Sequence, residues 1–356
     1  MSQDTDPVAA CRISSQPTFE QKVRFLGLPA NYPENPPAVL VKETHMSMVF
    51  LGGDRVYKLK KPIHLPFLDF RTLAARERNC REEVRLNRRL APQTYLGVVP
   101  LTLTAEGSLA LGQGTVVVDW LVVMRRLPEE LMLDRVLGRG RVHAAQLTQL
   151  ADVLANFYRK AERPSVPPED YLGGFARQHD ENRRVLTSRR FAIDPQRISK
   201  VLEGFEQHLA ATGPLLRDRA GGGHVLEGHG DLRPEHICLT DPIVIFDCLE
   251  FDPKLRLVDP CDELEFLAME CAILDHATVG RRLRRLVATR LGEAPPVALI
   301  RFYAAFRALL RARLSLAHLL DSAPRDPAKW EPLADRYLAY AEQALSPSGR
   351  ARQRSR

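Results

Sequence analysis

Hydrophobic and polar positions alternate in the first third of the chain, which is the spacing of half-buried strands. The segments "AVLVKETH", "MSMVFLGG" and "DRVYKLKK" (38–61) predict three strands, the last two joined by a Gly-Gly-Asp turn. The segment "GVVPLTLTAEGSLALG" predicts a hairpin that turns at Glu106 and Gly107, and "TVVVDWLVVMRRLP" (115–128) predicts a buried strand. One long helix, "FRTLAARERNCREEVRLNRRLAP" (70–92), interrupts these strands and is expected to end at Pro92.

After Pro128 the apolar positions recur at helical spacing instead. The segments that predict helices here are "VHAAQLTQLADVLANFYRKA", "RISKVLEGFEQHLAATGPLL", "CDELEFLAMECAIL" and "VALIRFYAAFRALLRARLSLAHLL". Only residues 229–251 interrupt them, with a short strand-turn-strand pattern. The order of elements therefore predicts an α+β protein, with a small sheet and one long helix followed by a larger, mainly helical part. Phe302, Tyr303 and Phe306 are expected in its core.

The same pattern divides the chain into four regions. Residues 1–36 form a leader with one short helix near "FEQKVRFLGL", ahead of a proline-rich connector. Residues 37–127 form the strand-rich domain, and residues 128–345 form the helical domain. Residues 346–356, "SPSGRARQRSR", are expected to be a basic disordered tail.

Composition narrows the class of protein. The chain has 356 residues, 45% of them apolar, which is typical of a globular protein with a substantial core. It shows no signal peptide and no apolar stretch of membrane-spanning length, and its six cysteines form no CxxC pair. A cytoplasmic protein with reduced thiols that binds no membrane is expected. The net charge of +7 comes with no nucleic-acid-binding motif, so no nucleic-acid partner is expected either.

One stretch of this basic chain is strongly acidic. Residues 241–275 contain ten aspartates and glutamates, against only Lys254 and Arg256. We interpret them as an acidic wall, which favours metal ions or a cationic, amine-bearing substrate.

Two of the candidate functional residues lie in the segment "HGDLRPEHICLTDPIVIFDCLEF" (229–251). Asp231 precedes one apolar run and Asp247 follows a second, so the two carboxylates can converge on one point. Phosphoryl transfer needs a base for the acceptor hydroxyl, a metal with its carboxylate, and a cation on the phosphates. Asp231 is the candidate base, Asp247 the candidate magnesium ligand, and Lys58 the candidate phosphate-binding cation. Taken singly, Lys58 is better interpreted as a surface lysine on an edge strand, with Lys60 on the same face.

These motifs together resemble the protein-kinase-like fold, and more closely the aminoglycoside phosphotransferase and choline kinase branch. That branch shows an "HGD-x-x-P-x-N" loop and an "I-D" strand, which stand here as "HGDLRPEH" and "VIFD". The front segment "ETHMSMVFLGGDRVYKLKKPIHLPFLDF" resembles an uncharacterised bacterial group within it. The resemblance covers about residues 38–320 and implies a two-lobed fold, ATP as phosphate donor and a magnesium ion.

The resemblance also implies roles for residues of the first lobe. Lys58 falls where the family lysine holds the nucleotide phosphates, and Glu83 falls near its glutamate partner, with Glu82 as the alternative. Ser47 lies in the phosphate-covering turn and can donate to a phosphate oxygen. Met124 begins the hinge segment where adenine would meet backbone groups.

In the second lobe, the resemblance implies that residues 229–236 form the catalytic loop. His229 is expected to be structural, with its ring buried and bonded to backbone. Arg233 is either a charge clamp on the transferred phosphate or a solvated loop residue. Asp259 and Asp262 are expected to brace the loop through hydrogen bonds. His236 replaces the family's asparagine metal ligand, so it either binds a softer ion such as Mn²⁺, or leaves a single metal, or is structural.

Two main functions follow from this comparison. The first is a small-molecule kinase with a hydroxyl-bearing acceptor, and the second is a pseudokinase that binds nucleotide or a partner without turnover. Nucleotidyl transfer and protein phosphorylation are further alternatives. Protein phosphorylation is the less favoured of the two, because no activation segment follows Asp247. Members of the group often carry a P-loop domain, and no "G-x-x-x-x-G-K-[ST]" loop occurs here, so such a partner domain would act in trans.

Overall fold

The structure is a computed structural model that describes residues 16–65, 68–140, 142–320 and 326–346. The chain divides into two compact units, Met1–Leu127 and Pro128–Arg356. Each unit has its own sheet or helix assembly and its own apolar core, so each is described by itself. The first fifteen residues of the expected leader, and the expected tail after Ser346, lie outside the described residues.

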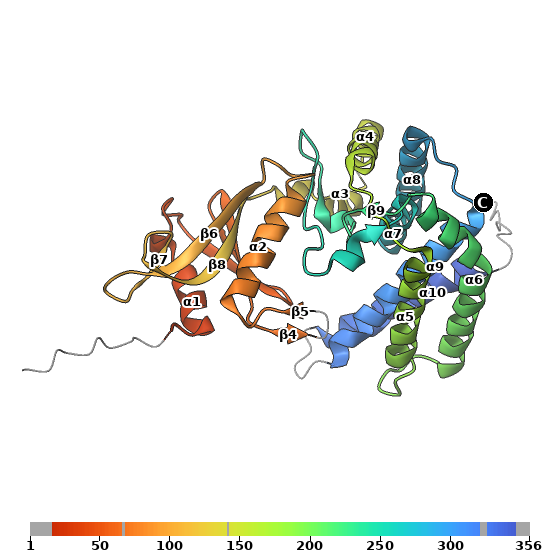
Figure 1. Ribbon diagram of the computed structural model, residues 1–356, viewed down its shortest axis with the longest axis horizontal. Helices are drawn as coiled ribbons and strands as arrows, with labels where there is room; N and C mark the ends of the chain where they lie inside the picture. The colour runs from red at the N-terminus through yellow and green to blue at the C-terminus, as the bar shows by residue number, and fades with distance from the viewer. Residues whose placement is uncertain (1–15, 66–67, 141, 321–325, 347–356) are drawn as a thin grey trace, which may run out of the picture. The chain divides into compact units, whose positions relative to one another are not determined.

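The first unit is built on a six-stranded antiparallel sheet with the order β1-β2-β3-β8-β6-β7 (Figure 1). The strands are β1 Val39–Glu43, β2 Ser47–Gly52, β3 Arg55–Lys60, β6 Tyr95–Leu103, β7 Leu109–Leu111 and β8 Val116–Arg125. A two-stranded pair, β4 His64–Leu65 and β5 Leu68–Asp69, stands apart from this sheet. Gly53 (φ +55°) and Gly107 (φ +81°) supply left-handed backbone in two of the turns. The predicted hairpin turn at Glu106 and Gly107 is confirmed.

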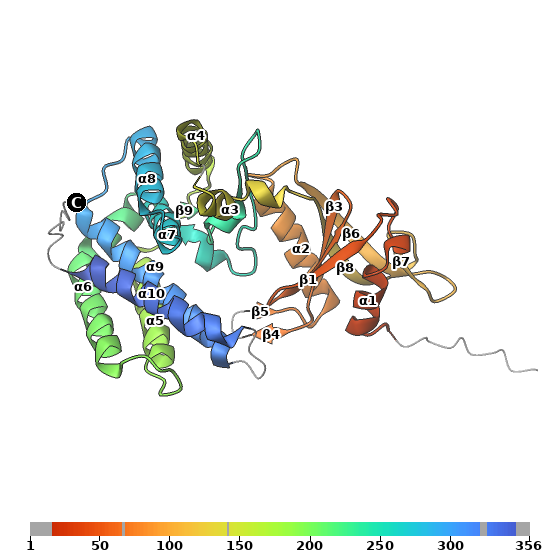
Figure 2. The same ribbon diagram turned by 180° about the vertical axis from the view of Figure 1, so that it is seen from behind.

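Two helices pack on this sheet. Helix α1, Phe19–Leu26, begins with a capping box between Thr18 and Gln21, and its apolar side buries Leu26 against the sheet. Helix α2, Leu73–Asn87, is capped by Thr72 and packs along β8 and β6, as both views show (Figures 1 and 2). It ends at Asn87 rather than at Pro92, and short turns fill the gap.

A buried carboxylate joins both helices to the sheet. Asp119 on β8 is 1% exposed and lies 2.9 Å from Lys22 Nζ of α1 and 2.7 Å from Arg76 Nε of α2. Two cations on one buried carboxylate are far more costly to separate than an exposed pair. This cluster therefore fixes where α1 and α2 sit on the unit's central strands.

The second unit is mainly helical. Its helices are α3 Leu133–Gly138, α4 Ala144–Lys160, α5 Pro168–Leu186, α6 Pro195–Gly221, α7 Pro260–Ile273, α8 Ala277–Leu291, α9 Val297–Ala317 and α10 Pro327–Leu345. Two short antiparallel pairs lie among them: β9 Leu226–Glu227 with β12 Leu257–Val258, and β10 Ile237–Cys238 with β11 Val244–Ile245. Helices α9 and α10 pack side by side, as do α5 and α6 (Figures 1 and 2). The predicted α+β class, with an antiparallel sheet and a larger helical part, is confirmed.

Aromatic rings fill the core of this helical unit. Phe302, Tyr303 and Phe306 on α9 are buried, as predicted, and pack against Phe175 of α5 and Phe205 of α6. Helix α7 is buried on nearly every side. None of the described helices is long and apolar enough to span a membrane.

Candidate functional site

The loop between β9 and β10 is held in a turn that only glycine fits. Gly230 adopts φ +87°, and a Cβ there would lie 2.9 Å from Leu249 Cβ. His229 beside it is fully buried, and its Nε2 lies 2.9 Å from the Phe246 carbonyl oxygen, to which it donates. Burial lowers the pKa of His229 to about 4, so its ring is neutral at pH 7. The expected structural role of His229 is therefore confirmed.

Asp231 follows this turn and is paired with Arg233. Asp231 Oδ2 lies 2.9 Å from Arg233 Nη2, and Arg233 Nη1 contacts Glu235 Oε1. Burial raises the pKa of the Asp231 carboxyl, but neighbouring positive charges, above all that of Arg233, outweigh it and hold the pKa at about 2. Asp231 is therefore ionised at neutral pH, and Arg233 is an ion-pair partner of it rather than a solvated loop residue.

His236 lies between the two candidate carboxylates. Its Nδ1 is 2.8 Å from the backbone oxygen of Asp231, and because a carbonyl only accepts, Nδ1 carries the proton. Its Nε2 is 3.6 Å from Asp247 Oδ2 and 3.2 Å from Arg233 Nη2, and its Nδ1 is 3.7 Å from Asp231 Oδ2. Asp247 follows β11 in left-handed backbone, with φ +63°. The structure thus brings Asp231, His236 and Asp247 together.

The donor set at this point fits a divalent cation. The Asp247 carboxylate is a hard oxygen ligand, and His236 Nε2 lies beside it, on a ring whose other nitrogen is fixed by a backbone bond. The Nε2 lone pair accepts Arg233 Nη2 at 3.2 Å, so Arg233 has to move before this nitrogen can bind a cation. No group of three or more such side chains that could hold a metal occurs in the described part of the chain. A cation here would therefore complete its ligands with water and phosphate oxygens, which is how Mg²⁺ commonly binds.

The first unit holds a second charged cluster. Lys58 Nζ lies 2.9 Å from Glu83 Oε1, and Lys60 Nζ contacts Glu83 Oε2. Glu82, the alternative partner, pairs instead with Arg85 at 2.8 Å on the outer side of α2. Strand β3 lies between β2 and β8, so Lys58 is not on an edge strand. Of the two glutamates, Glu83 is the one that Lys58 contacts.

The other two predicted residues of this unit lie at strand ends. Ser47 begins β2 and is 1% exposed, and its Oγ has no hydrogen-bond partner among the described residues. Met124 is partly exposed near the end of β8, opposite Val56 of β3. Just after it, the Arg126 amide already donates to the Asp54 carbonyl oxygen, at 2.8 Å.

The bracing of the loop differs from the expectation. Asp259 and Asp262 bond to Arg219 and Arg307 of neighbouring helices rather than to the loop. Glu263, for which the sequence predicted no role, accepts hydrogen bonds from the Gly230 amide at 2.5 Å and the Tyr158 hydroxyl at 3.0 Å. The expectation for Asp259 and Asp262 was wrong because they face cationic side chains from α6 and α9, whereas the next residue faces the loop. The glutamate that directly follows Asp262 in the sequence was the signal from which this role could have been predicted.

The interpretation of residues 241–275 as an acidic wall is also wrong. Five of its ten acidic residues form ion pairs with arginines from outside the stretch, and four of these five are buried. The pairs are Asp259–Arg219, Asp262–Arg307, Glu265–Arg284, Glu270–Arg311 and Asp275–Arg336. Because these charges are neutralised by the protein's own arginines, they do not support a cationic substrate.

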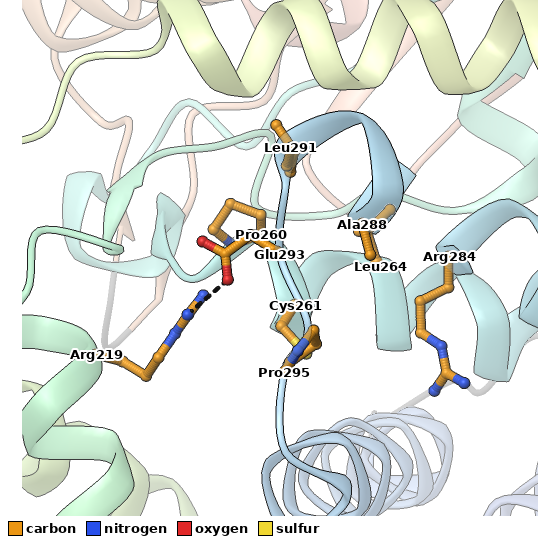
Figure 3. A pocket seen from close by; sticks show the side chains of 9 residues that line it. All are labelled: Arg219, Pro260, Cys261, Leu264, Arg284, Ala288, Leu291, Glu293 and Pro295. Carbon is orange, nitrogen blue, oxygen red and sulfur yellow. Dashed lines mark hydrogen bonds and ion pairs between the residues drawn. The ribbon is translucent and has the colours of Figure 1, made fainter. Parts of the chain in front are cut away.

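The helical unit has a small cavity that lies away from the 229–236 loop. It has a volume of about 20 Å³ and is lined by residues of α6, α7, α8 and the segment after α8, among them Arg219 and Glu293, which are bonded to each other (Figure 3). That volume holds about one water molecule. No residue of the 229–236 loop lines it, so it is separate from the site.

Comparison with known proteins agrees with this geometry. Residues 67–262 match the sequence profile described as "Phosphotransferase enzyme family". The chain belongs to this family. The resemblance to aminoglycoside phosphotransferases and choline kinases is therefore confirmed.

Solved structures of the same fold include kinases of small alcohols. A choline/ethanolamine kinase family protein from Mesorhizobium loti is 16% identical, with a TM-score of 0.55 over 92% of this chain and 95% of its own. Choline kinase from Cryptosporidium parvum is 11% identical, with a TM-score of 0.54 over 91% and 94%. An aminoglycoside 2′-phosphotransferase IIIa mutant in complex with GDP is 15% identical, with a TM-score of 0.55 over 91% and 99%. At these identities the likeness shows the fold alone.

Curated relatives in mycobacteria are more similar in sequence. Uncharacterised proteins of Mycobacterium bovis and Mycobacterium tuberculosis are 33% identical over 312 residues, which is 87% of this chain. The chain spans about 60% of the length of these relatives. The expected likeness to an uncharacterised bacterial group is confirmed.

Proposed function

We propose that the chain is an ATP-dependent phosphotransferase that moves the γ-phosphoryl group to a hydroxyl of a small molecule. The observation that carries the proposal is the position of His236, 3.7 Å from one carboxylate oxygen of Asp231 and 3.6 Å from one of Asp247. One side chain thus lies near both the proposed base and the proposed metal ligand, and phosphoryl transfer needs both in one site. Family membership supports the reaction class.

Asp231 is the proposed base. The oxygen of the acceptor hydroxyl forms a bond to the γ-phosphorus, the bond from that phosphorus to the bridging oxygen breaks, and the diphosphate leaves. The hydroxyl proton passes to the Asp231 carboxylate. With a pKa of about 2, this carboxylate is a weak base, so it orients the hydroxyl first and takes the proton only as the new bond forms. A positioned carboxylate of this kind contributes about 10²–10⁴-fold.

The remaining residues bind and orient the phosphates. A divalent cation held by Asp247 and His236, magnesium or alternatively manganese, would neutralise charge on the transferred group. Arg233, now on Asp231, is proposed to turn to the transferred phosphoryl group as its charge develops. Lys58 and Ser47 are proposed to bind the nucleotide phosphates, and the segment from Met124 to receive the base.

The donor and acceptor are open to direct test. One neighbour's name records GDP and another's records choline, so GTP is tested beside ATP, and choline, ethanolamine and aminoglycosides are the first acceptors. We would measure the shift of thermal unfolding with each nucleotide, with and without Mg²⁺ or Mn²⁺. At a ligand concentration about 100-fold above its Kd, the expected stabilisation is about 2.7 kcal/mol.

Three variants separate binding from turnover. Lys58→Ala and Asp247→Ala should lose the metal-dependent stabilisation. Asp231→Asn should keep it and lose phosphoryl transfer. A well-folded wild type that no nucleotide stabilises, with or without metal, would refute the proposal.

A pseudokinase is the second candidate, and one observation favours it. Arg233 bonds both Asp231 Oδ2 and His236 Nε2, so it occupies the base and the nitrogen that faces the metal site. A protein that binds nucleotide without metal dependence and transfers no phosphate to water or any acceptor would be this module.

A further inference from the structure

Arg233 in the 229–236 loop contacts its partners with two different nitrogens. Its Nη2 lies 2.9 Å from Asp231 Oδ2 and 3.2 Å from His236 Nε2. Its Nη1 contacts Glu235 Oε1 instead. The proposed base and the proposed metal-binding nitrogen therefore share one nitrogen of Arg233, while Glu235 contacts the other.

A cation on His236 Nε2 cannot coexist with the contact that Arg233 makes there. His236 Nδ1 donates to the backbone oxygen of Asp231 at 2.8 Å, so it carries the proton and Nε2 offers a single lone pair. Arg233 Nη2 now occupies that lone pair. A cation that takes it displaces Nη2 and repels the guanidinium charge. Because the same Nη2 forms the ion pair with Asp231 Oδ2, this displacement also uncovers the carboxylate of the proposed base.

Glu235 gives the displaced guanidinium a place to remain. It lies in the short 3-10 turn Pro234–His236, and its side chain is 41% exposed, whereas that of Arg233 is 17% exposed. Its contact with Nη1 does not involve Nη2, so it survives when Nη2 loses both of its partners. A mostly buried guanidinium without any carboxylate would be costly, because a buried charge has to be paired.

A further donor of Arg233 is unused in the present arrangement. Its Nε is buried and has no hydrogen-bond partner among the described residues. Once Nη2 is released, Nε and Nη2 together form the planar fork that binds two oxygens of one phosphate. The position that Arg233 now takes therefore leaves its side chain incompletely satisfied, and a phosphate group would supply the missing acceptors.

We infer that Glu235 is a positioning residue: it retains Arg233 through Nη1 while a cation takes His236 Nε2, so that one event fills the metal site and frees Asp231. The inference rests on the proposed base and cation site, and it adds the residue that holds Arg233 after it has moved. Every side chain that it uses belongs to the 229–236 loop.

A double-mutant cycle between Arg233 and Glu235 tests this role. We would measure by calorimetry the Kd of a non-hydrolysable ATP analogue with Mn²⁺ and without metal, because the ratio of the two values reports the contribution of the cation. Glu235→Gln should lower this contribution by about tenfold, the order of effect of one charge-assisted hydrogen bond. Arg233→Met should raise it, because the competitor for Nε2 is gone. With Arg233→Met already present, Glu235→Gln should change it by less than about threefold, since only a solvent-screened charge is lost.

Two further variants separate positioning from charge and from folding. Glu235→Asp keeps the carboxylate, so the contribution of the cation should stay within about threefold of wild type. Glu181→Gln removes an equal charge from a surface pair with Arg184 on α5, and it should leave the ratio unchanged. A purely structural or electrostatic role for Glu235 predicts the same loss in both backgrounds of the cycle.

The outcomes separate this inference from the proposed function. If Glu235→Gln lowers the contribution of the cation equally with and without Arg233, or does not lower it at all, the role of Glu235 is refuted and the proposed function stands. A weaker contribution of the cation in Arg233→Met would refute it as well. If wild type binds the analogue neither with nor without Mn²⁺, the proposed function falls, and this inference falls with it.

Discussion

Glu263 gives the sharpest test of how the 229–236 loop is held. Its buried carboxylate accepts the Gly230 amide at 2.5 Å and the Tyr158 hydroxyl at 3.0 Å. Burial raises the pKa of Glu263, and the two donors stabilise its carboxylate. The substitution Glu263→Ala would leave both donors buried and unpaired. Each orphaned donor costs about 1–3 kcal/mol, so the expected loss of unfolding free energy is about 2–6 kcal/mol.

The substitution Glu263→Gln should cost much less. The glutamine oxygen can accept the Gly230 amide, and its amino group can donate to the Tyr158 oxygen, so both contacts survive as neutral hydrogen bonds. The expected loss is about 1 kcal/mol, the difference between a charge-assisted and a neutral bond. Tyr158→Phe removes one donor alone and should fall between the two.

Urea unfolding followed by circular dichroism measures these free energies. Hydrogen exchange then reports whether the Gly230 amide loses protection. In Glu263→Ala it should exchange much faster, and in Glu263→Gln it should remain protected. If Ala and Gln cost the same, within about 0.5 kcal/mol, and the Gly230 amide is equally protected in both, the loop is not held by this carboxylate.

Three further predictions follow from the same structure. His236→Asn should lower the Kd of Mg²⁺ and raise that of Mn²⁺, measured by calorimetry in the presence of ATP, because an amide oxygen suits the harder ion. Asp119→Ala should destabilise the protein by about 3–5 kcal/mol in urea, because its two buried cationic partners lose their carboxylate. The exposed Asp69→Ala should cost much less, because solvent screens its pair with Arg71. Arg233→Met should raise the pKa of Asp231 from about 2, measured by NMR titration. The contribution of that lowered pKa to the free energy of unfolding is present above about pH 4 and is lost as the pH falls through 2. The difference in unfolding free energy between the variant and wild type should therefore vanish near pH 2.

Each of these has an outcome that contradicts it. An unchanged ratio of Mg²⁺ to Mn²⁺ affinity in His236→Asn would remove His236 from the metal site. Equal losses for Asp119→Ala and Asp69→Ala would mean that the buried cluster contributes no more than a surface pair. An Asp231 pKa that stays near 2 in Arg233→Met would show that the other cations suffice to hold it there.

Elements whose signal is local could be predicted from the amino-acid sequence. Alternating apolar positions in 38–61 and the turn at Gly107 fall where β1, β2, β3 and the β6–β7 hairpin occur. The "HGD" and "VIFD" motifs were enough to name the loop and the carboxylates that the structure brings together around His236. These features depend on neighbours within a few residues, through strand period and turn chemistry.

Several helices of the second unit were not predicted. Helices α5, α8 and α10 carry many charged residues on their exposed sides, and α8 contains five arginines. Helix propensity alone is a weak signal, and the burial of one face against other helices is what stabilises them.

Which charged side chains meet one another depends on how distant segments of the chain pack. Adjacent residues Glu82 and Glu83 look alike in sequence, but they point to different sides of α2, and the one facing β3 meets both lysines. Likewise, the acidic residues of α7 became internal partners because α9 lies against that helix, which brings Arg307 to Asp262 across 45 positions of chain. A carboxylate that is charged and costly to bury acquires its partner only when distant segments pack, so its role cannot be assigned from its neighbours in sequence.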